Sequence, residues 1–158
     1  MNRKLLLTIS CAAVVLISAC STREDFVVLN KSSAVIEVKY RLKGCTPETA
    51  GKNVDLTSPA KLSMKEFQKS DRVWTNLPIG QYEYDGLTCT FTVSVAPNEA
   101  LLVDYAYNYR GHDIEGSDLR FDVDSLIITG AKGTIRLEGR QAQTQFKNES
   151  GDYVIAYQ

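Results

Sequence analysis

Apolar and polar residues alternate with a period of two along much of the chain, which is the pattern of half-buried β-strands. In the segment 34–42 the apolar side chains share one face, and charged side chains occupy the other. The segment 87–95 repeats the alternation, with Leu87 and Cys89 expected on its core-facing side. The short apolar run 26–29 is typical of a further strand.

Turn sequences rich in glycine, proline and asparagine, such as Ala96-Pro97-Asn98, separate these runs at short intervals. Residues 126–158 read as a meander of three or four strands. Residues 58–69 favour an extended strand, with a helix capped by Ser58 as the alternative. Together these patterns predict an all-β fold, an antiparallel β-sandwich or small barrel of about 7–10 short strands.

The first twenty residues have the features of an export signal. A basic start, Asn2-Arg3-Lys4, precedes an apolar run, 5–17, that is shorter than the ~20 residues needed to span a bilayer. Ile17-Ser18-Ala19-Cys20 then resembles the lipobox of bacterial lipoprotein precursors, although leucine is commonest where Ile17 stands. The resemblance implies cleavage before Cys20 and acylation of Cys20. An ordinary secretory signal is less consistent, because Ile17 would stand where such cleavage sites carry a small residue.

The expected organisation is a signal-peptide helix in 1–19, a lipidated tether in 20–25 and one β-sandwich domain in 26–158. A tether of five residues after Cys20 reaches ~17 Å at most, so we expect the domain to lie close to the lipid headgroups. Ser21 follows the cysteine, where an aspartate tends to retain Gram-negative lipoproteins in the inner membrane. The resemblance therefore implies the outer membrane, facing the periplasm, if the source is Gram-negative.

Composition limits the possible partners. Without residues 1–19 the chain has 158 − 19 = 139 residues, enough for one domain, and a net charge of 16 − 19 = −3. This balance argues against nucleic acid and against electrostatic attachment to anionic lipids. We expect the protein to contact the membrane through the lipid on Cys20, with an envelope protein as a possible further partner. The sequence identifies no small-molecule ligand.

Two cysteines besides Cys20 remain after cleavage, Cys45 and Cys89. In an oxidising compartment such a pair is most simply a disulfide. Two free buried thiols are the alternative. The chain contains no Cys-x-x-Cys redox motif.

The turn Leu77-Pro78-Ile79-Gly80-Gln81-Tyr82 and the strand and proline turn after it resemble the corresponding parts of transthyretin-like and immunoglobulin-like bacterial surface sandwiches. The resemblance covers only residues 71–105. It supports the predicted fold and implies no activity.

The sequence nominates no catalytic residue, metal ligand or cofactor. His112 is the only histidine, so a zinc site is not expected, and no Gly-x-Ser-x-Gly motif offers a nucleophile to pair with it. The acidic residues between Asp113 and Asp124 do not have the spacing of a calcium-binding EF-hand loop and read as solvated. Ser58 and Lys61 match Ser-x-x-Lys without its companion motifs, and we interpret the match as chance.

Alternate tyrosines, Tyr105, Tyr107 and Tyr109, are expected to share a strand face with Leu101 and Val103. This stripe is interpreted either as an inner sandwich face or, together with His112, as a recognition surface for a glycan or protein.

The favoured hypothesis is a non-enzymatic, membrane-anchored lipoprotein of the cell envelope that acts as an accessory or binding domain. The alternatives are an envelope hydrolase using His112 with nearby acidic residues, and a small protein inhibitor of a hydrolase.

Overall fold

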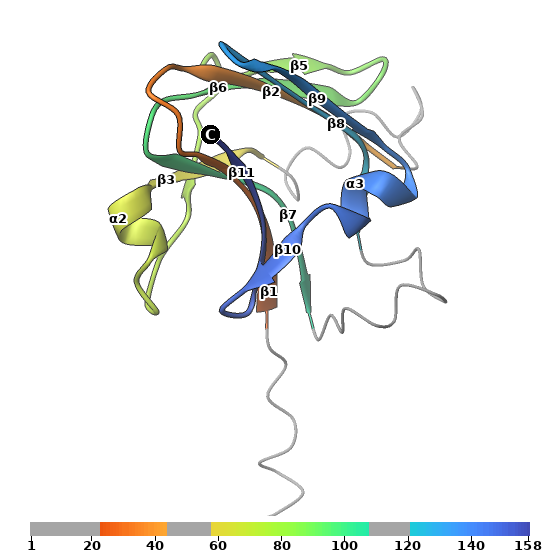
Figure 1. Cartoon of the computed structure of the whole chain (residues 1–158). Helices are drawn as coiled ribbons and strands as arrows, with labels where there is room; N and C mark the ends of the chain where they lie inside the picture. The colour runs from red at the N-terminus through yellow and green to blue at the C-terminus, as the bar shows by residue number, and fades with distance from the viewer. Residues whose placement is uncertain (1–22, 44–57, 108–120) are drawn as a thin grey trace, which may run out of the picture.

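The computed structural model describes residues 23–43, 58–107 and 121–158, and within them two β-sheets pack face to face (Figure 1). The first sheet, sheet A, has the order β10 (Lys147–Glu149), β11 (Asp152–Tyr157), β1 (Arg23–Asn30), β7 (Glu99–Tyr107), β3 (Ala60–Ser63) and β4 (Thr75–Asn76). The second, sheet B, has the order β5 (Glu83–Asp85), β6 (Thr90–Val95), β2 (Ile36–Leu42), β8 (Val123–Gly130) and β9 (Gly133–Glu138). Two short helices accompany them, α2 (Met64–Phe67) and α3 (Arg140–Thr144). The predicted all-β sandwich is confirmed.

The described residues form eleven strands, slightly more than the sequence suggests, because β4, β5 and β10 are only two or three residues long. All neighbouring strands within this part of the chain pair antiparallel except β1 and β11, which run parallel. The predicted signal-peptide helix lies outside the described residues.

The main core lies between the two sheets and contains an aromatic cluster around Phe26. Its ring stacks on Tyr153 with centroids 5.0 Å apart and meets Phe121 at 4.7 Å and Phe146 at 5.4 Å. Phe146 follows α3, so this helix closes one end of the sandwich. Aromatic pairs at these separations add to the stabilisation from burial alone.

A second, smaller cluster covers the outer face of sheet A. Val27 and Leu29 alternate with the core-facing residues of β1 and point to this face, where Phe67 and Trp74 pack over them. Phe67 and Trp74 belong to residues 64–74, which we call the flap. Because both faces of β1 are covered, its sequence is continuously apolar instead of alternating.

The flap begins with one turn of helix that the sequence analysis did not place. Ser63 caps α2: its hydroxyl accepts from the backbone N–H of Glu66, whose carboxylate in turn accepts from the N–H of Ser63. This capping box stops β3 and starts α2. Residues 58–69 therefore contain both structures considered, a strand first and then a helix that is capped by Ser63, not by Ser58.

A β-bulge in β7 takes Tyr105 off the face that it was predicted to share with Leu101 and Val103. Phe26 pairs with Asp104 but Val27 pairs with Leu102, so Val103 is an extra residue in β7. A bulge shifts the alternation by one position. Val103 still faces the core, as Leu101 does, but after the bulge Tyr105 pairs with Asp25 and lies on the outer face of sheet A.

The segment before β6 also departs from simple alternation. Leu87 is 76% exposed, because it belongs to the turn after β5 and not to the strand. Cys89 is fully buried as predicted, yet its φ of 49° is that of a turn residue, and β6 begins only at Thr90. Cys89 is disulfide-bonded. Its partner lies outside the described residues, as Cys45 does, so their pairing stays a prediction.

Residues 126–158 do not form one meander. β8 and β9 make a hairpin in sheet B, α3 then crosses the end of the sandwich, and β10 and β11 belong to sheet A. Ala142 of α3 is fully buried, which explains why the chain turns inward there. No helix in the described ranges is long and apolar enough to cross a membrane.

β1 begins at Arg23, three residues before the expected domain start at Phe26. Residues 23–25, which the sequence analysis assigned to the tether, therefore belong to sheet A.

Candidate functional site

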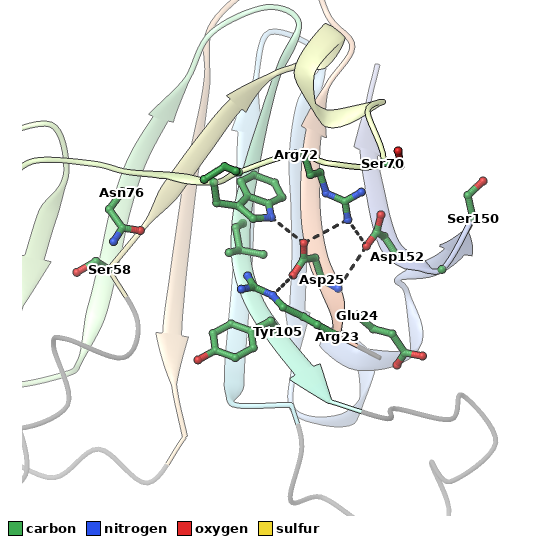
Figure 2. Close-up of a pocket in the computed structure, with 14 residues that line it drawn as sticks. Arg23, Glu24, Asp25, Ser58, Ser70, Arg72, Asn76, Tyr105, Ser150 and Asp152 are labelled. Atoms are coloured by element: carbon green, nitrogen blue, oxygen red, sulfur yellow. Dashed lines mark hydrogen bonds and ion pairs between the residues drawn. The ribbon is translucent and has the colours of Figure 1, made fainter. Parts of the chain in front are cut away.

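A pocket of about 900 Å³ lies on the outer face of sheet A, beside the end of the flap (Figure 2). Its walls come from the start of β1, from β7, from the turn before β11 and from the flap. Its lining includes Arg23, Asp25, Arg72, Trp74, Leu102, Tyr105 and Asp152.

Asp25 is the centre of the pocket, with a side chain only 6% exposed. Its Oδ1 accepts from Nε of Arg23 at 2.7 Å. Its Oδ2 accepts from Nη2 of Arg72 at 3.2 Å and from the indole Nε1 of Trp74 at 2.6 Å. A buried carboxylate is costly unless it is paired and hydrogen-bonded, and these three donors supply that compensation.

Asp152 is the second carboxylate and comes from β11, the parallel neighbour of β1. Its Oδ1 accepts from Nη2 of Arg72 at 2.5 Å and from the backbone N–H of Asp25 at 3.4 Å. Burial raises the pKa of Asp152, and the attraction of Arg72 opposes the rise without cancelling it. Within the described residues no hydrogen bond involves its Oδ2, which leaves that oxygen as an acceptor at the pocket.

Arg72 joins these carboxylates to the flap. Its guanidinium bridges Asp25 and Asp152 and lies 5.0 Å from the centre of the Phe67 ring. One guanidinium thus links strand β1, strand β11 and the flap. The result is a rigid wall in which each polar contact restricts the others.

The other side of the pocket is aromatic and apolar. The Arg23 guanidinium lies 4.3 Å from the centre of the Tyr105 ring, a cation–π contact that orients the ring. Leu102 and Trp74 line the pocket beside it. Figure 2 shows Tyr105 and Asn76 on one side of Asp25, with Asp152 and Ser150 on the other. The pocket therefore has an aromatic half and a polar half.

A further carboxylate, Asp104, fixes the bulge that turns Tyr105 outward. Its oxygens accept from the backbone N–H of Tyr105 at 2.8 Å and of Asp122 at 2.7 Å. Burial, helped by the nearby charge of Asp122, raises the pKa of Asp104 to about 7, while its two hydrogen bonds and Lys43 oppose the rise. Tyr40, fully buried in the same region, has its pKa raised as well.

This arrangement is suited to binding. Arg23 and Arg72 are each paired with a buried aspartate, and both oxygens of Asp25 already accept hydrogen bonds. A carboxylate held in this way is poorly placed to move a proton. In the described part of the chain no group of three or more metal-ligating side chains comes together.

Of the predicted recognition surface, the structure places Tyr105 in this pocket. Tyr107 ends β7, but its side chain is not described, and Tyr109 and His112 lie outside the described residues. Cys20, the predicted lipidation site, also lies outside them. Cys89 precedes β6 in the opposite sheet.

Sequence reasoning missed Asp25, Arg72, Trp74 and Asp152. The only signal was a charged residue directly before the apolar run of β1, and it was assigned to the tether.

Comparison with known proteins adds no relative. No family model, curated protein or solved structure matches the chain.

Proposed function

We propose that this protein is a lipid-anchored, non-enzymatic component of a bacterial cell envelope that binds a partner at the membrane surface through the pocket on sheet A. The observation that carries the proposal is the position of Arg23, which lines the pocket and begins β1. The lipobox-like cysteine, Cys20, stands only three positions earlier.

The short chain between Cys20 and Arg23 limits how far the pocket can lie from the membrane. Three extended residues span about 10 Å, so acylated Cys20 would hold Arg23 within that distance of the headgroups. Two or three acyl chains anchor a protein durably, whereas one is marginal. The partner is therefore expected at the bilayer surface and not far from it.

Binding is favoured over catalysis because the charged side chains of the pocket are already held by ion pairs and hydrogen bonds. The Asp25–Arg72–Asp152 network holds its side chains in place before any ligand arrives, which reduces the entropy lost on binding.

Anchoring is tested by replacing Cys20 with serine in the full-length precursor. The wild-type protein is expected in the membrane fraction after a carbonate wash and labelled by palmitate, whereas Cys20→Ser is expected to be unlabelled and soluble. Cys11→Ala is the matched control, because that cysteine would be removed with the signal. Membrane association of Cys20→Ser equal to that of the wild type would overturn the anchoring.

Binding is tested by placing a photo-crosslinking amino acid at Val73, which lines the pocket and is 80% exposed. Val35 is the control, since it is also an exposed valine, at 59%, but lies in the turn between β1 and β2. Light-dependent adducts in intact cells are expected from position 73 and not from position 35. Identical adducts from both positions, or none from 73, would contradict a partner at this pocket.

A further inference from the structure

We propose that the pocket on sheet A takes an uncharged sugar, whose ring stacks on the aromatic half while its hydroxyls meet the polar half. This inference rests on the proposed function and deepens it by naming the class of ligand. The observation behind it is that aromatic side chains line a pocket whose two arginines are already paired with aspartates.

The charge balance argues against an ionic ligand. A site for phosphate or carboxylate normally offers a guanidinium or ammonium dedicated to the ligand. Here Arg72 donates through Nη2 to Asp25 and Asp152, and Arg23 donates through Nε to Asp25, so an aspartate already balances each guanidinium charge. Nε of Arg72 has no hydrogen-bond partner in the described part of the chain, but it is buried. The same contacts balance the charges of Asp25 and Asp152, so neither aspartate is dedicated to a cationic ligand. An uncharged molecule with many hydroxyls does not need one.

The aromatic half suits a sugar ring. The face of an aromatic ring carries the negative part of its quadrupole, and the C–H groups of a pyranose ring are weakly positive. Tyr105 and Trp74 line the pocket together with the apolar side chain of Leu102. The indole N–H of Trp74 is taken up by Asp25, so what Trp74 offers the pocket is its carbon skeleton.

The polar half suits the hydroxyls. Oδ2 of Asp152 is an acceptor there with no hydrogen bond in the described part of the chain. The Asn76 amide lines the pocket on the Tyr105 side, where it adds a polar group at the edge of the aromatic half (Figure 2). The pocket of about 900 Å³ is large enough for a small ligand. Its aromatic half would contact the face of a sugar ring, and its polar half would contact the hydroxyls at the edge of that ring.

Trp74 is the only tryptophan in the chain, so its fluorescence reports directly on this pocket. The lipidated protein is purified in a detergent without a sugar headgroup and titrated with cellotetraose, maltotetraose and chitotetraose. A second arm places the protein in phosphatidylethanolamine vesicles with and without monoglucosyl diacylglycerol. The two arms separate a free glycan from the headgroup of a glycolipid as the source of the sugar.

A saturable change in Trp74 fluorescence with at least one soluble tetrasaccharide, or with the glycolipid alone, is the expected result. Tyr105→Ala is expected to weaken the binding about tenfold, equivalent to about 1.4 kcal/mol, and Tyr105→Phe to retain it. Asp152→Asn is expected to weaken it as well, since half of its oxygens are replaced by a donor. The control, Asp124→Asn on sheet B, is expected to bind like the wild type.

No response to any sugar overturns the inference, and so does a response to tetralysine or glycerol phosphate without one to sugars. Equal binding by Tyr105→Ala and the wild type also overturns it, provided that both give the same far-UV circular dichroism. These failures are distinct from failure of the proposed function, because anchoring through Cys20 is measured separately by fractionation.

Discussion

The indole Nε1 of Trp74 donates a 2.6 Å hydrogen bond to Oδ2 of Asp25, across 49 positions of sequence. This contact holds the end of the flap to the first strand of sheet A. Arg72, two residues earlier in the flap, binds the same carboxylate oxygen. One buried oxygen therefore fixes both the flap and a wall of the pocket, so the stability of the fold and the shape of the pocket depend on the same residue.

Replacing Asp25 with asparagine should be strongly destabilising. The change removes the charge that Arg23 and Arg72 compensate and puts an amide N–H₂ in place of an accepting oxygen. Breaking a buried ion pair by removing one partner costs about 3–5 kcal/mol. Urea unfolding followed by far-UV circular dichroism measures the loss.

Asp124→Asn is the matched control for Asp25→Asn. Asp124 pairs with Arg41 on sheet B, where the two side chains are 36% and 50% exposed. Exposed pairs contribute about 0–1 kcal/mol, so this variant should unfold nearly as the wild type does. Equal losses for the two variants would show that the Asp25 network does not stabilise the fold.

The fold class followed from the sequence because burial of one sheet face imposes a period of two on strands such as β2 and β6. The pocket did not, because its parts meet only in three dimensions: Asp25 and Asp152 are 127 positions apart. The bulge at Val103 left no local signature either. It depends on the pairing of β7 with β1, and it alone decides which way Tyr105 points.

The route of the last thirty residues shows the same limit. Local patterns predicted the strand-like runs, but not that α3 would carry the chain from sheet B to sheet A. That crossing depends on Ala142 and Phe146 filling the end of the core, which is a long-range packing effect.

Asp104 should make stability depend on pH near neutrality. Its pKa is raised from 3.8 to about 7 in the folded protein, so the folded state binds this proton more tightly than the unfolded state. The stabilisation is complete below about pH 4 and is lost as the pH rises through 7. A shift of this size corresponds to about 4 kcal/mol as an upper limit.

The titration is measured by urea unfolding at several values between pH 5 and pH 8, in the wild type and in Asp104→Asn. The variant lacks the titrating group, so the fall in stability across this range should be smaller in it. The neighbouring Asp122, Lys43, Tyr40 and Tyr82 are unchanged in both proteins and cancel in the difference. Parallel pH profiles for the two proteins would contradict the assignment to Asp104.

Asn30 should be essential to the stability of the sandwich at the end of β1, opposite the end where Arg23 begins this strand. It is fully buried, and its Nδ2 donates to the carbonyl oxygens of Ala34 at 2.8 Å and Val95 at 2.9 Å. Its Oδ1 accepts from the N–H of Ser32 at 3.0 Å. One amide thus ties β1 to the turn that follows it and to the end of β6.

Asn30→Asp keeps the shape of this side chain but places a carboxylate oxygen against two carbonyl oxygens. We expect it to destabilise the fold more than Asn30→Ala, which removes the hydrogen bonds without adding repulsion. Thermal unfolding of the two variants gives the order. A more stable aspartate variant would show that donation by Nδ2 is not what holds this end together.

The disulfide of Cys89 is expected to close on Cys45. Cys11 would be removed with the signal and Cys20 would carry the lipid, so Cys45 is the remaining thiol. A disulfide that closes the loop from Cys45 to Cys89 would stabilise the fold by about 4 kcal/mol in the chain-entropy model. Mass spectrometry of non-reduced peptides from the purified lipoprotein should find residues 45 and 89 in one linked pair.

Unfolding of the single and double variants tests the same pairing energetically. If one bond joins the two cysteines, Cys45→Ser and Cys89→Ser should each lower the stability by a similar amount, and the double variant should lose little more than either. The reduced wild type should resemble them. A stable Cys45→Ser beside a destabilised Cys89→Ser would mean that Cys89 pairs elsewhere. If its partner is Cys11 or Cys20, the assignment of that cysteine to the signal or to the lipid is wrong.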